Sequence, residues 1–438
     1  MRDLTSRLRD IVRRDHGGAS APPRELTYVS DVGSELNAGR TDLARAAEAL
    51  GGVAADDGHG ACIAIDRVWD ADRFHGRRAV GGFAPVSDAP LSLFDTRAGQ
   101  TPEWARRVVF FDLETTGLSG GAGTLAFLAG CGWFEDGAFR VRQFFLAAPS
   151  GERAMLASLG RVMDDATLLV TFNGRTFDVP LMETRWAFHR SSAATDDLPH
   201  FDMLPSARRL WGRREVSDVP ERASCTLSAL ERSVLGFHRV GDVPGFEIPV
   251  RYFHFLRTGD ARAIEGVLEH NRHDLLSLAG VMSHALSMAS EGPEGCRQPC
   301  EQMGLGRLYE RVGDRDRAIR AFELAATGDD RELRPHAFAR LATLLGRLDR
   351  HDEAAAAWHS VLDGTRGRRG VLSPLARRAT EALAIHHEHR VRDLPAARTY
   401  AAQLQADAAG RTQQHAAHRL GRIDRKLATK ESKERLDF

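Results

Sequence analysis

Two carboxylate residues, Asp112 and Glu114, directly follow a short apolar run at residues 108–111. Such a run is typical of a buried strand. Residues two apart on a strand project to the same face, so both carboxylates point toward one place. Like charges held side by side are costly to bury unless cations compensate them. Acidic residues at strand ends are commonly solvated, but here the chain turns away at Thr115-Thr116-Gly117, which favours a candidate cation site.

Three other residues, which lie much later in the chain, could share this site. Asp178 follows an apolar stretch that ends in a polar turn, at residues 172–177. Asp is also a favoured helix N-cap, and for Asp178 taken alone that interpretation is the better one. His270 and Asp274 stand four residues apart in a helical stretch, so they share one face, as an exposed ion pair also would. Each residue has a structural explanation of its own, but their combination is more specific than any one of them.

The elements that position these residues form a recognisable order. Apolar runs, an Asp-Gly turn signal at Asp136-Gly137 and helical spacing predict three strands joined by hairpins, then helix, strand and helix. We expect strands at residues 108–111, 124–134, 139–146 and 167–172, and helices at residues 154–163 and 179–189. This order predicts an α/β domain with a mixed sheet flanked by helices.

The chain on either side of this domain has a different character. Residues 1–105 combine a basic start, a short strand at residues 62–65 and a loop-like stretch, and we treat them as an N-terminal extension. Helices are expected at residues 226–235 and 261–288, and the Gly- and Pro-rich stretch at residues 291–299 marks a boundary. The expected domains are therefore residues 1–105, 106–290 and an all-α domain at residues 300–430.

A small residue followed four positions later by an aromatic one recurs in the helical part. The pairs are Ala318 and Phe322, Ala354 and Trp358, and Ala396 and Tyr400. The first two pairs are offset by 36 residues and the last two by 42. Offsets of this size suggest tetratricopeptide-type helix pairs, in which the small residue lets neighbouring helices approach. An ordinary helical bundle is the alternative.

Composition limits the kinds of protein this can be. The 438 residues carry 60 basic and 60 acidic side chains, so any nucleic-acid contact must come from local clusters. The densest basic group near the domain is Arg208, Arg209, Arg213 and Arg214, which could bind phosphates or could form a solvated helix face. The sequence has no apolar signal core and no apolar run of roughly eighteen residues, so we expect a cytoplasmic protein without a membrane segment.

Other residues that could carry chemistry have simpler interpretations. Five scattered cysteines form no disulfide framework, and Cys296 and Cys300 are expected to be reduced thiols in a linker rather than half of a zinc site. Asp202 precedes a helix that begins near Pro205, so an N-cap is expected there. The histidine-rich run at residues 386–389 is expected to lie on the surface of a helical repeat, and the glycines at residues 120–123 lack the Lys-Ser/Thr of a P-loop.

The acidic segments, taken together and in this order, resemble the DEDD superfamily of 3′–5′ exonucleases, which share a ribonuclease H-like fold. Residues 111–117 (FDLETTG) look like the first motif and residues 172–178 (FNGRTFD) like the second. Several stretches are similar to the YprB-like ribonuclease H-like family, which often carries tetratricopeptide repeats after its nuclease domain. These stretches are residues 117–121 (GLSGG), 201–204 (FDML), 227–231 (LSALE), 245–249 (GFEIP) and 270–274 (HNRHD).

The resemblance implies a two-metal site for Mg²⁺ or Mn²⁺. Asp112 would bridge both ions, Glu114 and Asp274 would hold the ion that activates water, and Asp178 would help position the second ion. DEDD nucleases usually place a His five residues, or a Tyr four residues, before the last Asp. Here Glu269 stands at the first spacing and His270 at the second, so His270 is the candidate general base.

We therefore expect a metal-dependent nuclease, a 3′–5′ exonuclease on DNA or RNA, whose helical repeats recruit a protein partner. One alternative is a scaffold that keeps the fold with weak or no catalysis and binds nucleic acid or protein. Another is an adaptor in which the acidic motifs are coincidental. Metal-dependent degradation of an oligonucleotide separates the first hypothesis from both others.

Overall fold

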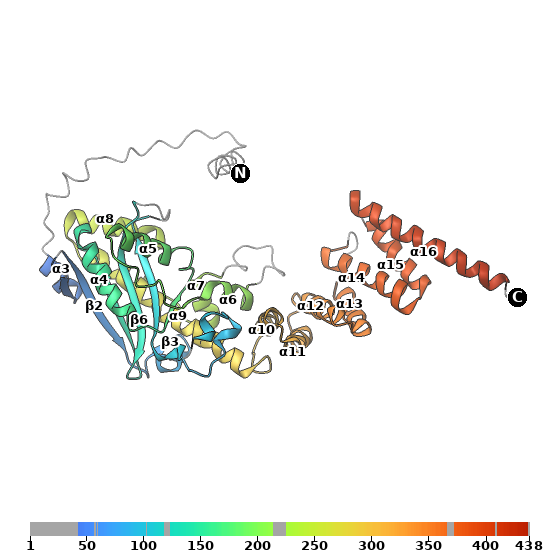
Figure 1. Cartoon of the computed structure of the whole chain (residues 1–438), viewed down its shortest axis with the longest axis horizontal. Helices are drawn as coiled ribbons and strands as arrows, with labels where there is room; N and C mark the ends of the chain where they lie inside the picture. Colours follow the sequence, from blue (N-terminus) through green and yellow to red (C-terminus); the bar gives the residue numbers. More distant parts are fainter. Residues whose placement is uncertain are drawn as a thin grey trace, which may run out of the picture. The chain divides into compact units, whose positions relative to one another are not determined.

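The computed structural model describes residues 43–56, 58, 60–101, 103–117, 123–212, 225–365, 372–407 and 410–436. Within these residues a sheet with flanking helices is followed by a region that is entirely helical (Figure 1). Parts of two motifs named above, residues 118–121 and the basic residues Arg213 and Arg214, lie outside the described residues.

Within the described residues, seven strands form one mixed sheet in the order β1-β2-β7-β6-β5-β8-β9. The neighbours from β1 to β5 are antiparallel, whereas β5, β8 and β9 run parallel to one another. The strands are β1 (Val53–Asp56), β2 (Ala61–Trp69), β5 (Val108–Thr115), β6 (Ala126–Glu135), β7 (Ala138–Phe145), β8 (Leu168–Thr171) and β9 (His200–Asp202). The mixed sheet flanked by helices confirms the predicted fold class.

The hairpin between β6 and β7 forms at the predicted turn. Asp136 and Gly137 have φ angles of 51° and 78°, so both adopt the left-handed conformation that a two-residue hairpin turn needs. The turn fixes the register in which Glu135 faces Ala138 and Phe134 faces Phe139. As a result, the long strands of the hairpin support β5, which carries the first acidic motif.

The sheet extends into the part of the chain that we treated as an N-terminal extension. The strand expected at residues 62–65 is observed as β2, which pairs with β7 over seven residue positions from Ile63 to Trp69. Strand β1 adds an edge beside β2, and a small separate hairpin joins β3 (Phe74–His75) to β4 (Arg78–Ala79). This pairing could not be predicted from the sequence, because β2 and β7 are far apart along the chain.

Helices cover both faces of the sheet (Figure 1). They are α3 (Leu43–Leu50), α4 (Glu152–Met163), α5 (Asp178–Phe188), α6 (Met203–Leu210), α7 (Leu227–Leu230), α8 (Ile248–Thr258) and α9 (Arg262–Glu291). Short 3-10 turns are η1 (Val80–Phe83), η2 (Leu91–Leu93), η3 (Ala98–Gln100), η4 (Trp104–Arg106), η5 (Pro149–Gly151) and η7 (Gly245–Glu247), and a π-helical turn, η6 (Glu231–Leu235), continues α7.

Helix α9 takes part in both hydrophobic cores of this region. Its first turns, around Val267, pack in the core that contains Phe111 of β5 and helices α4, α5 and α8. Its later turns, from Leu275 onward, pack in the core that contains Val108 and Phe110. Because side chains alternate along a strand, Asp112 and Glu114 lie on the same face of β5 as Val108 and Phe110, and on the opposite face from Phe111. The segment at residues 270–274 therefore lies between two buried stretches of α9.

The helical region begins after the predicted boundary at residues 291–299. Its helices are α10 (Pro299–Val312), α11 (Arg315–Thr327), α12 (Arg334–Arg347), α13 (His351–Thr365), α14 (Pro374–His386), α15 (Leu394–Asp407) and α16 (Gly410–Leu436), with a π-helical turn, η8 (His387–Val391), after α14. Each helix contacts the next along the chain. Consecutive helices in contact are the arrangement that repeated helix pairs would give.

The small and aromatic positions of the predicted repeat differ in burial. Ala318, Phe322, Ala354 and Trp358 are all buried, as close helix packing requires. In α15 the fully buried small residues are instead Ala397 and Ala401, while Ala396 and Tyr400 are half-buried. The third pair is therefore displaced by one position from the contact it was expected to make.

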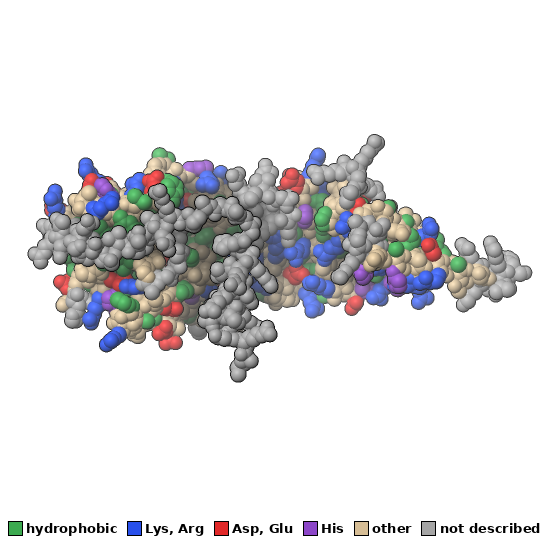
Figure 2. Space-filling model, turned by 90° about the horizontal axis from the view of Figure 1, so that it is seen from above, with side chains coloured by type: hydrophobic (Ala, Val, Ile, Leu, Met, Phe, Trp, Pro, Cys, Tyr) green, Lys and Arg blue, Asp and Glu red, His purple; other side chains and the backbone are tan. Residues whose placement is uncertain are grey.

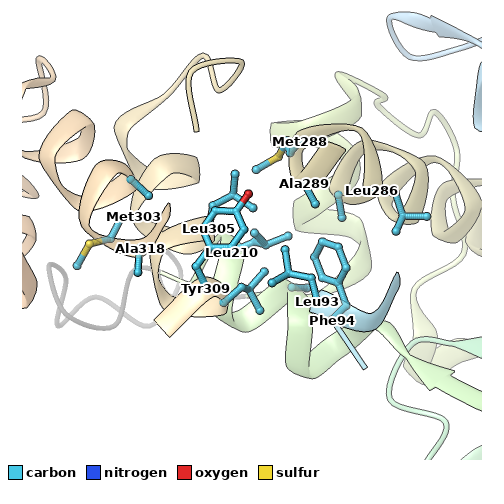
Figure 3. Packing of buried hydrophobic residues seen from close by; sticks show 14 of the residues in the cluster. Leu93, Phe94, Leu210, Leu286, Met288, Ala289, Met303, Leu305, Tyr309 and Ala318 are labelled. Carbon is cyan, nitrogen blue, oxygen red and sulfur yellow. The ribbon is translucent and has the colours of Figure 1, made fainter. Parts of the chain in front are cut away.

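A hydrophobic junction joins the sheet region to the first helices of the helical region. Leu93 and Phe94, Leu210 of α6 and Ala289 of α9 belong to the same buried cluster as Tyr309 of α10 (Figure 3). The guanidinium of Arg311 donates hydrogen bonds to the backbone oxygens of Leu93 and Phe94, at 2.6 and 2.8 Å. The junction is therefore packed and hydrogen-bonded rather than a flexible linker.

The surface agrees with the balanced composition. Basic and acidic side chains are intermixed on the face of the molecule shown in Figure 2. Arg208 is exposed, and Arg209 is half-buried. Among the described residues, no helix is both long and apolar enough to cross a bilayer.

Candidate metal-binding site

Asp112 and Glu114 project from β5 into a partly buried site. Burial raises the pKa of Asp112 well above its usual range, and the charges of Asp274, Glu114 and Asp178 raise it further. Burial likewise raises the pKa of Glu114, followed by the charges of Asp274 and Asp178. The four predicted acidic residues therefore act on one another, although their motifs are far apart in the chain. A bound cation would relieve this repulsion.

Asp112 is held in place by a buried amide network. The side-chain amide of Asn271 donates to Oδ2 of Asp112 at 2.8 Å, and Nε2 of Gln143 in β7 donates to Oδ1 of Asn271 at 2.8 Å. Gln143 and Asn271 are fully buried. Since Asn271 occupies one oxygen of Asp112, the other oxygen of that carboxylate is free of this network. Asn271 lies within the 270–274 stretch but was not identified as a site residue from the sequence.

Glu114, His270 and Asp274 form the tightest cluster in the site. One ligand atom of each residue lies within 4.8 Å of the others, and no other group of three or more His, Cys, Asp or Glu residues in the described chain meets this criterion. The two residues from α9 contact each other directly, because Nε2 of His270 lies 3.3 Å from Oδ2 of Asp274. This contact shows the shared helix face that their spacing predicts.

An arginine that the sequence reasoning missed lies beside this cluster. Arg239 donates to Oδ1 of Asp274 at 2.5 Å and makes a two-pronged ion pair with Glu231. It also contacts Asp242, with 3.2 Å between its Nη1 and Oδ2 of that residue. The side chains of Arg239 and Glu231 are only 7% and 1% exposed, so solvent screens neither charge effectively.

The backbone around Arg239 explains how it reaches the site. Glu231 lies at the start of the π-helical turn η6, which ends at Gly236 in the left-handed conformation, with φ of 66°. The chain then returns toward α9, so Arg239 meets both Glu231 and Asp274. The sequence stretch at residues 227–231 pointed to Glu231 without giving it a role, and Arg239 stands in no recognisable motif. Its position follows from the fold alone.

Asp178 lies at the start of α5 but does not cap it. The N-cap position is taken by Phe177, which makes no side-chain capping bond, and Asp178 is the first helical residue. The N-cap interpretation of Asp178 is therefore wrong. Burial raises the pKa of Asp178 to about 7; a backbone hydrogen bond opposes the shift, and the charges of Asp202 and Asp274 add to it.

Asp202 is an N-cap, as expected, and it also shapes the turn before Asp178. Its carboxylate accepts from the backbone N–H of Leu204 in α6 at 3.0 Å. The same carboxylate accepts from the N–H groups of Asn173 and Arg175, at 2.8 and 3.2 Å. Asn173 has φ of 73°, the left-handed conformation that Asn tolerates better than most residues. Asp202 thus anchors the turn that leads into Asp178.

The donor set suits a divalent cation. Carboxylate oxygens are the ligands of hard ions such as Mg²⁺ and Mn²⁺, and an imidazole nitrogen is a common ligand of transition ions. The raised pKa values of Asp112, Glu114 and Asp178 show how poorly the site tolerates its own negative charge. Cys296 and Cys300 form no disulfide, but only Cys296 lies between the helices α9 and α10, because α10 begins at Pro299 and contains Cys300. The linker interpretation is therefore wrong for Cys300.

Comparisons with known proteins agree with this architecture. A family model described as the RNase_H superfamily matches residues 109–286, a range that includes all five predicted site residues. The uncharacterized protein YprB of Bacillus subtilis (strain 168) is 32% identical over 304 residues, which cover 68% of this chain and 69% of that protein. The mixed sheet, the acidic site on β5 and these two matches together show that the chain belongs to the RNase H superfamily.

Proposed function

We propose that this protein is a metal-dependent nuclease, a 3′–5′ exonuclease that hydrolyses phosphodiester bonds at single-stranded ends of DNA or RNA. The observation that carries the proposal is the gathering of Asp112, Glu114, Asp178 and Asp274 into one partly buried site, in which each charge raises the pKa of another. Proteins of the RNase H superfamily are generally hydrolytic nucleases that use divalent metals.

The four acidic residues and His270 form the proposed catalytic set. Two divalent ions, Mg²⁺ or Mn²⁺, would activate the attacking water and stabilise the leaving oxygen. In this proposal Asp112 would help to hold both ions, Glu114 and Asp274 would hold the first, and Asp178 would help to hold the second. Asn271 keeps the Asp112 carboxylate in one orientation, and Asp202 does the same for the turn before Asp178. His270 offers one ring nitrogen either as a general base or as a ligand.

The helical region would supply the contacts that select a target. We propose that α10 to α16 form tetratricopeptide-like pairs that bind a protein partner, because each helix contacts the next and the small residues between them are buried. A nucleic-acid end would enter the site on the sheet. Basic and acidic side chains are intermixed on the face shown in Figure 2 and balance in the whole sequence, so contacts near the site would provide the affinity for nucleic acid.

The proposal is tested with single-stranded DNA and RNA that carry a label at the 5′ or the 3′ end, incubated with Mg²⁺ or Mn²⁺. We expect the wild-type chain to shorten the 5′-labelled strand stepwise from its 3′ end. Asp112→Asn should abolish cleavage, and its thermal unfolding temperature without metal should not fall, since one repelling charge is removed.

A matched control is Asp66→Asn, which changes an aspartate on β2 of the same sheet that pairs with Arg142 at 2.7 Å on the surface. This variant should cleave as the wild type does. Wild-type turnover by Asp112→Asn would refute the site. Metal-induced thermal stabilisation of the wild type without any cleavage would instead favour the scaffold hypothesis.

A further inference from the structure

We propose that His270 binds the catalytic ion directly through Nε2, and that this nitrogen ligand makes the site prefer a transition ion such as Mn²⁺ over Mg²⁺. The inference rests on the proposed function and deepens it, because it assigns to His270 a role other than that of the general base. It follows from the hydrogen bonds around the ring and from the atoms that Nε2 faces.

The hydrogen of the imidazole is fixed on Nδ1. That nitrogen lies 2.8 Å from Oδ1 of Asp242, and an ionised carboxylate can only accept a hydrogen bond. The guanidinium of Arg239 also approaches Nδ1, at 3.3 Å, but it can only donate. The shorter contact with Asp242 decides between them, so Nδ1 carries the hydrogen. In the neutral ring, the lone pair is then on Nε2.

The contact that Nε2 makes is with a carboxylate oxygen, which is an acceptor. Nε2 lies 3.3 Å from Oδ2 of Asp274. One ring nitrogen of His270 and one carboxylate oxygen each of Asp274 and Glu114 lie within 4.8 Å of one another. A lone pair and two carboxylate oxygens repel one another unless a cation lies among them. A proton can join two of these atoms, whereas one metal ion can be coordinated by all three. The cluster is therefore a three-ligand site with one nitrogen and two oxygen donors.

Neighbouring side chains hold His270 and Asp274, the two residues that α9 contributes to this cluster, in their orientations. Asp242 holds His270, and Arg239 occupies Oδ1 of Asp274 so that Oδ2 remains for the site. Arg239 is itself fixed by the buried carboxylate of Glu231. Carboxylate partners of this kind commonly fix the tautomer and orientation of a metal-binding histidine. Asp242, Arg239 and Glu231 are positioning residues in this arrangement.

The mixed donor set determines which ions fit. Mg²⁺ is a hard ion that takes oxygen ligands and keeps several waters. Imidazole suits the later first-row transition ions best, and Mn²⁺, the first ion of that series, accepts a nitrogen ligand more readily than Mg²⁺ does. A site made of carboxylates alone would not separate Mg²⁺ from Mn²⁺ in this way. His270 is therefore the residue that creates the preference.

The full-length protein with Mn²⁺ as the probe tests the inference by pulsed electron paramagnetic resonance. A directly bound imidazole couples the unpaired electrons of Mn²⁺ to a ¹⁴N nucleus, and we expect this modulation in the wild type. His270→Gln should remove the modulation and weaken Mn²⁺ binding. Asp242→Ala should weaken binding by about 10- to 100-fold, the usual effect of losing such a partner.

His273→Gln is the matched control, because His273 lies one residue before Asp274 on the same helix and its ring packs against Phe237. It should keep both the modulation and the affinity. The wild type should also gain more thermal stability from Mn²⁺ than from an equal concentration of Mg²⁺, and His270→Gln should lose that difference.

The outcomes separate this inference from the proposed function. If Mn²⁺ binds and supports cleavage but shows no ¹⁴N modulation, His270 is not a ligand, while the nuclease proposal stands. If neither ion binds, both proposals are overturned. Modulation that persists in His270→Gln would place the nitrogen on another residue and would refute the assignment.

Discussion

Asp112 depends on a contact that only a glycine permits. Its partner Asn271 packs directly against Gly130 of β6, and a Cβ atom at that position would collide with the Asn271 carboxamide. Asn271 cannot retreat freely, because Gln143 and Asp112 hold it by hydrogen bonds on both sides. The absence of one side chain on a neighbouring strand thus sets the orientation of the first acidic residue.

Gly130→Ala should destabilise the fold and impair the site together. The added methyl group must displace Asn271, so we expect a loss of about 1–3 kcal/mol in unfolding free energy, as for other overpacked cores, and a marked fall in cleavage. Chemical denaturation and the end-labelled assay measure the two effects.

Gly160→Ala is the matched control for this prediction. Gly160 lies in α4, where a Cβ atom would meet only the Cβ of Ala194, at 3.9 Å. Alanine should stabilise that helix by about 0.5–1 kcal/mol without affecting cleavage. Equal activity and stability of Gly130→Ala and the wild type would contradict the proposed role of Asn271.

At the scale of single residues, the acidic residues of the candidate site could be predicted from the sequence, but the residues that hold them in place could not. Asp112, Glu114, Asp178, His270 and Asp274 could be predicted because their spacing matches strand ends and helix turns, and because their order resembles a known superfamily. Arg239 could not be predicted, because its contacts with Glu231 and Asp274 join a loop to two separate helices. Such contacts depend on the folded path of the chain and leave no periodic pattern.

At the scale of elements, the short strand β9 connects a helix cap to the site. Its last residue, Asp202, caps α6 and also binds two backbone N–H groups of the turn that precedes Asp178. One buried carboxylate therefore fixes the start of one helix and the approach to another. Since β9 pairs with β8 in parallel, both turns leave the same edge of the sheet.

Asp202→Ala should reduce both stability and cleavage. Loss of an Asp N-cap costs about 0.5–2 kcal/mol, and here the turn at residues 173–175 also loses its acceptor. We expect thermal unfolding at a lower temperature and weaker cleavage of the labelled strands.

Asp314→Ala serves as the control, since Asp314 caps α11 in the helical region and accepts from the N–H of Arg317. Asp314→Ala should lower the unfolding temperature by a similar amount, but it should cleave the labelled strands as the wild type does. A variant Asp202→Ala that loses stability but keeps full cleavage would limit Asp202 to a structural role.

The long strands and helices could be predicted because their signals are local. The apolar run before Asp112 and the turn at Asp136-Gly137 are observed at β5 and at the β6–β7 hairpin. The pairing of β2 with β7 and the three-residue strand β9 could not be predicted, because each depends on a neighbour distant in sequence. In α15 the buried small residues are Ala397 and Ala401 in place of the expected Ala396, and this one-position shift likewise depends on packing against α16.

At the scale of the whole molecule, the sheet region and the first helical pairs share one hydrophobic core. The buried cluster extends from Phe110 in β5 through Leu275 and Tyr309 to Leu383 in α14. A separate small cluster, which contains Ala397 and Ile423, holds α15 and α16. We therefore expect the sheet and the helices as far as α14 to unfold cooperatively.

Gly304→Val should break this cooperativity. Gly304 of α10 lies against the backbone of Leu210 in α6, so a larger side chain must separate the two helices. We expect calorimetry to show two resolved transitions in place of the single main transition of the wild type.

Gly346→Ala, in α12, is the corresponding control, because a Cβ atom there would meet nothing within 4 Å. Its unfolding profile should match that of the wild type. A single transition in Gly304→Val as well would show that the junction does not couple the two regions.

Helix α9 has a mechanical consequence for the candidate site. Its 30 residues make a rod of about 45 Å, with Asp274 near the middle and the junction with α10 beyond its far end. A continuous ladder of backbone hydrogen bonds resists stretching along its axis. A force applied to the helical region would therefore be transmitted along α9 and would displace the carboxylate of Asp274.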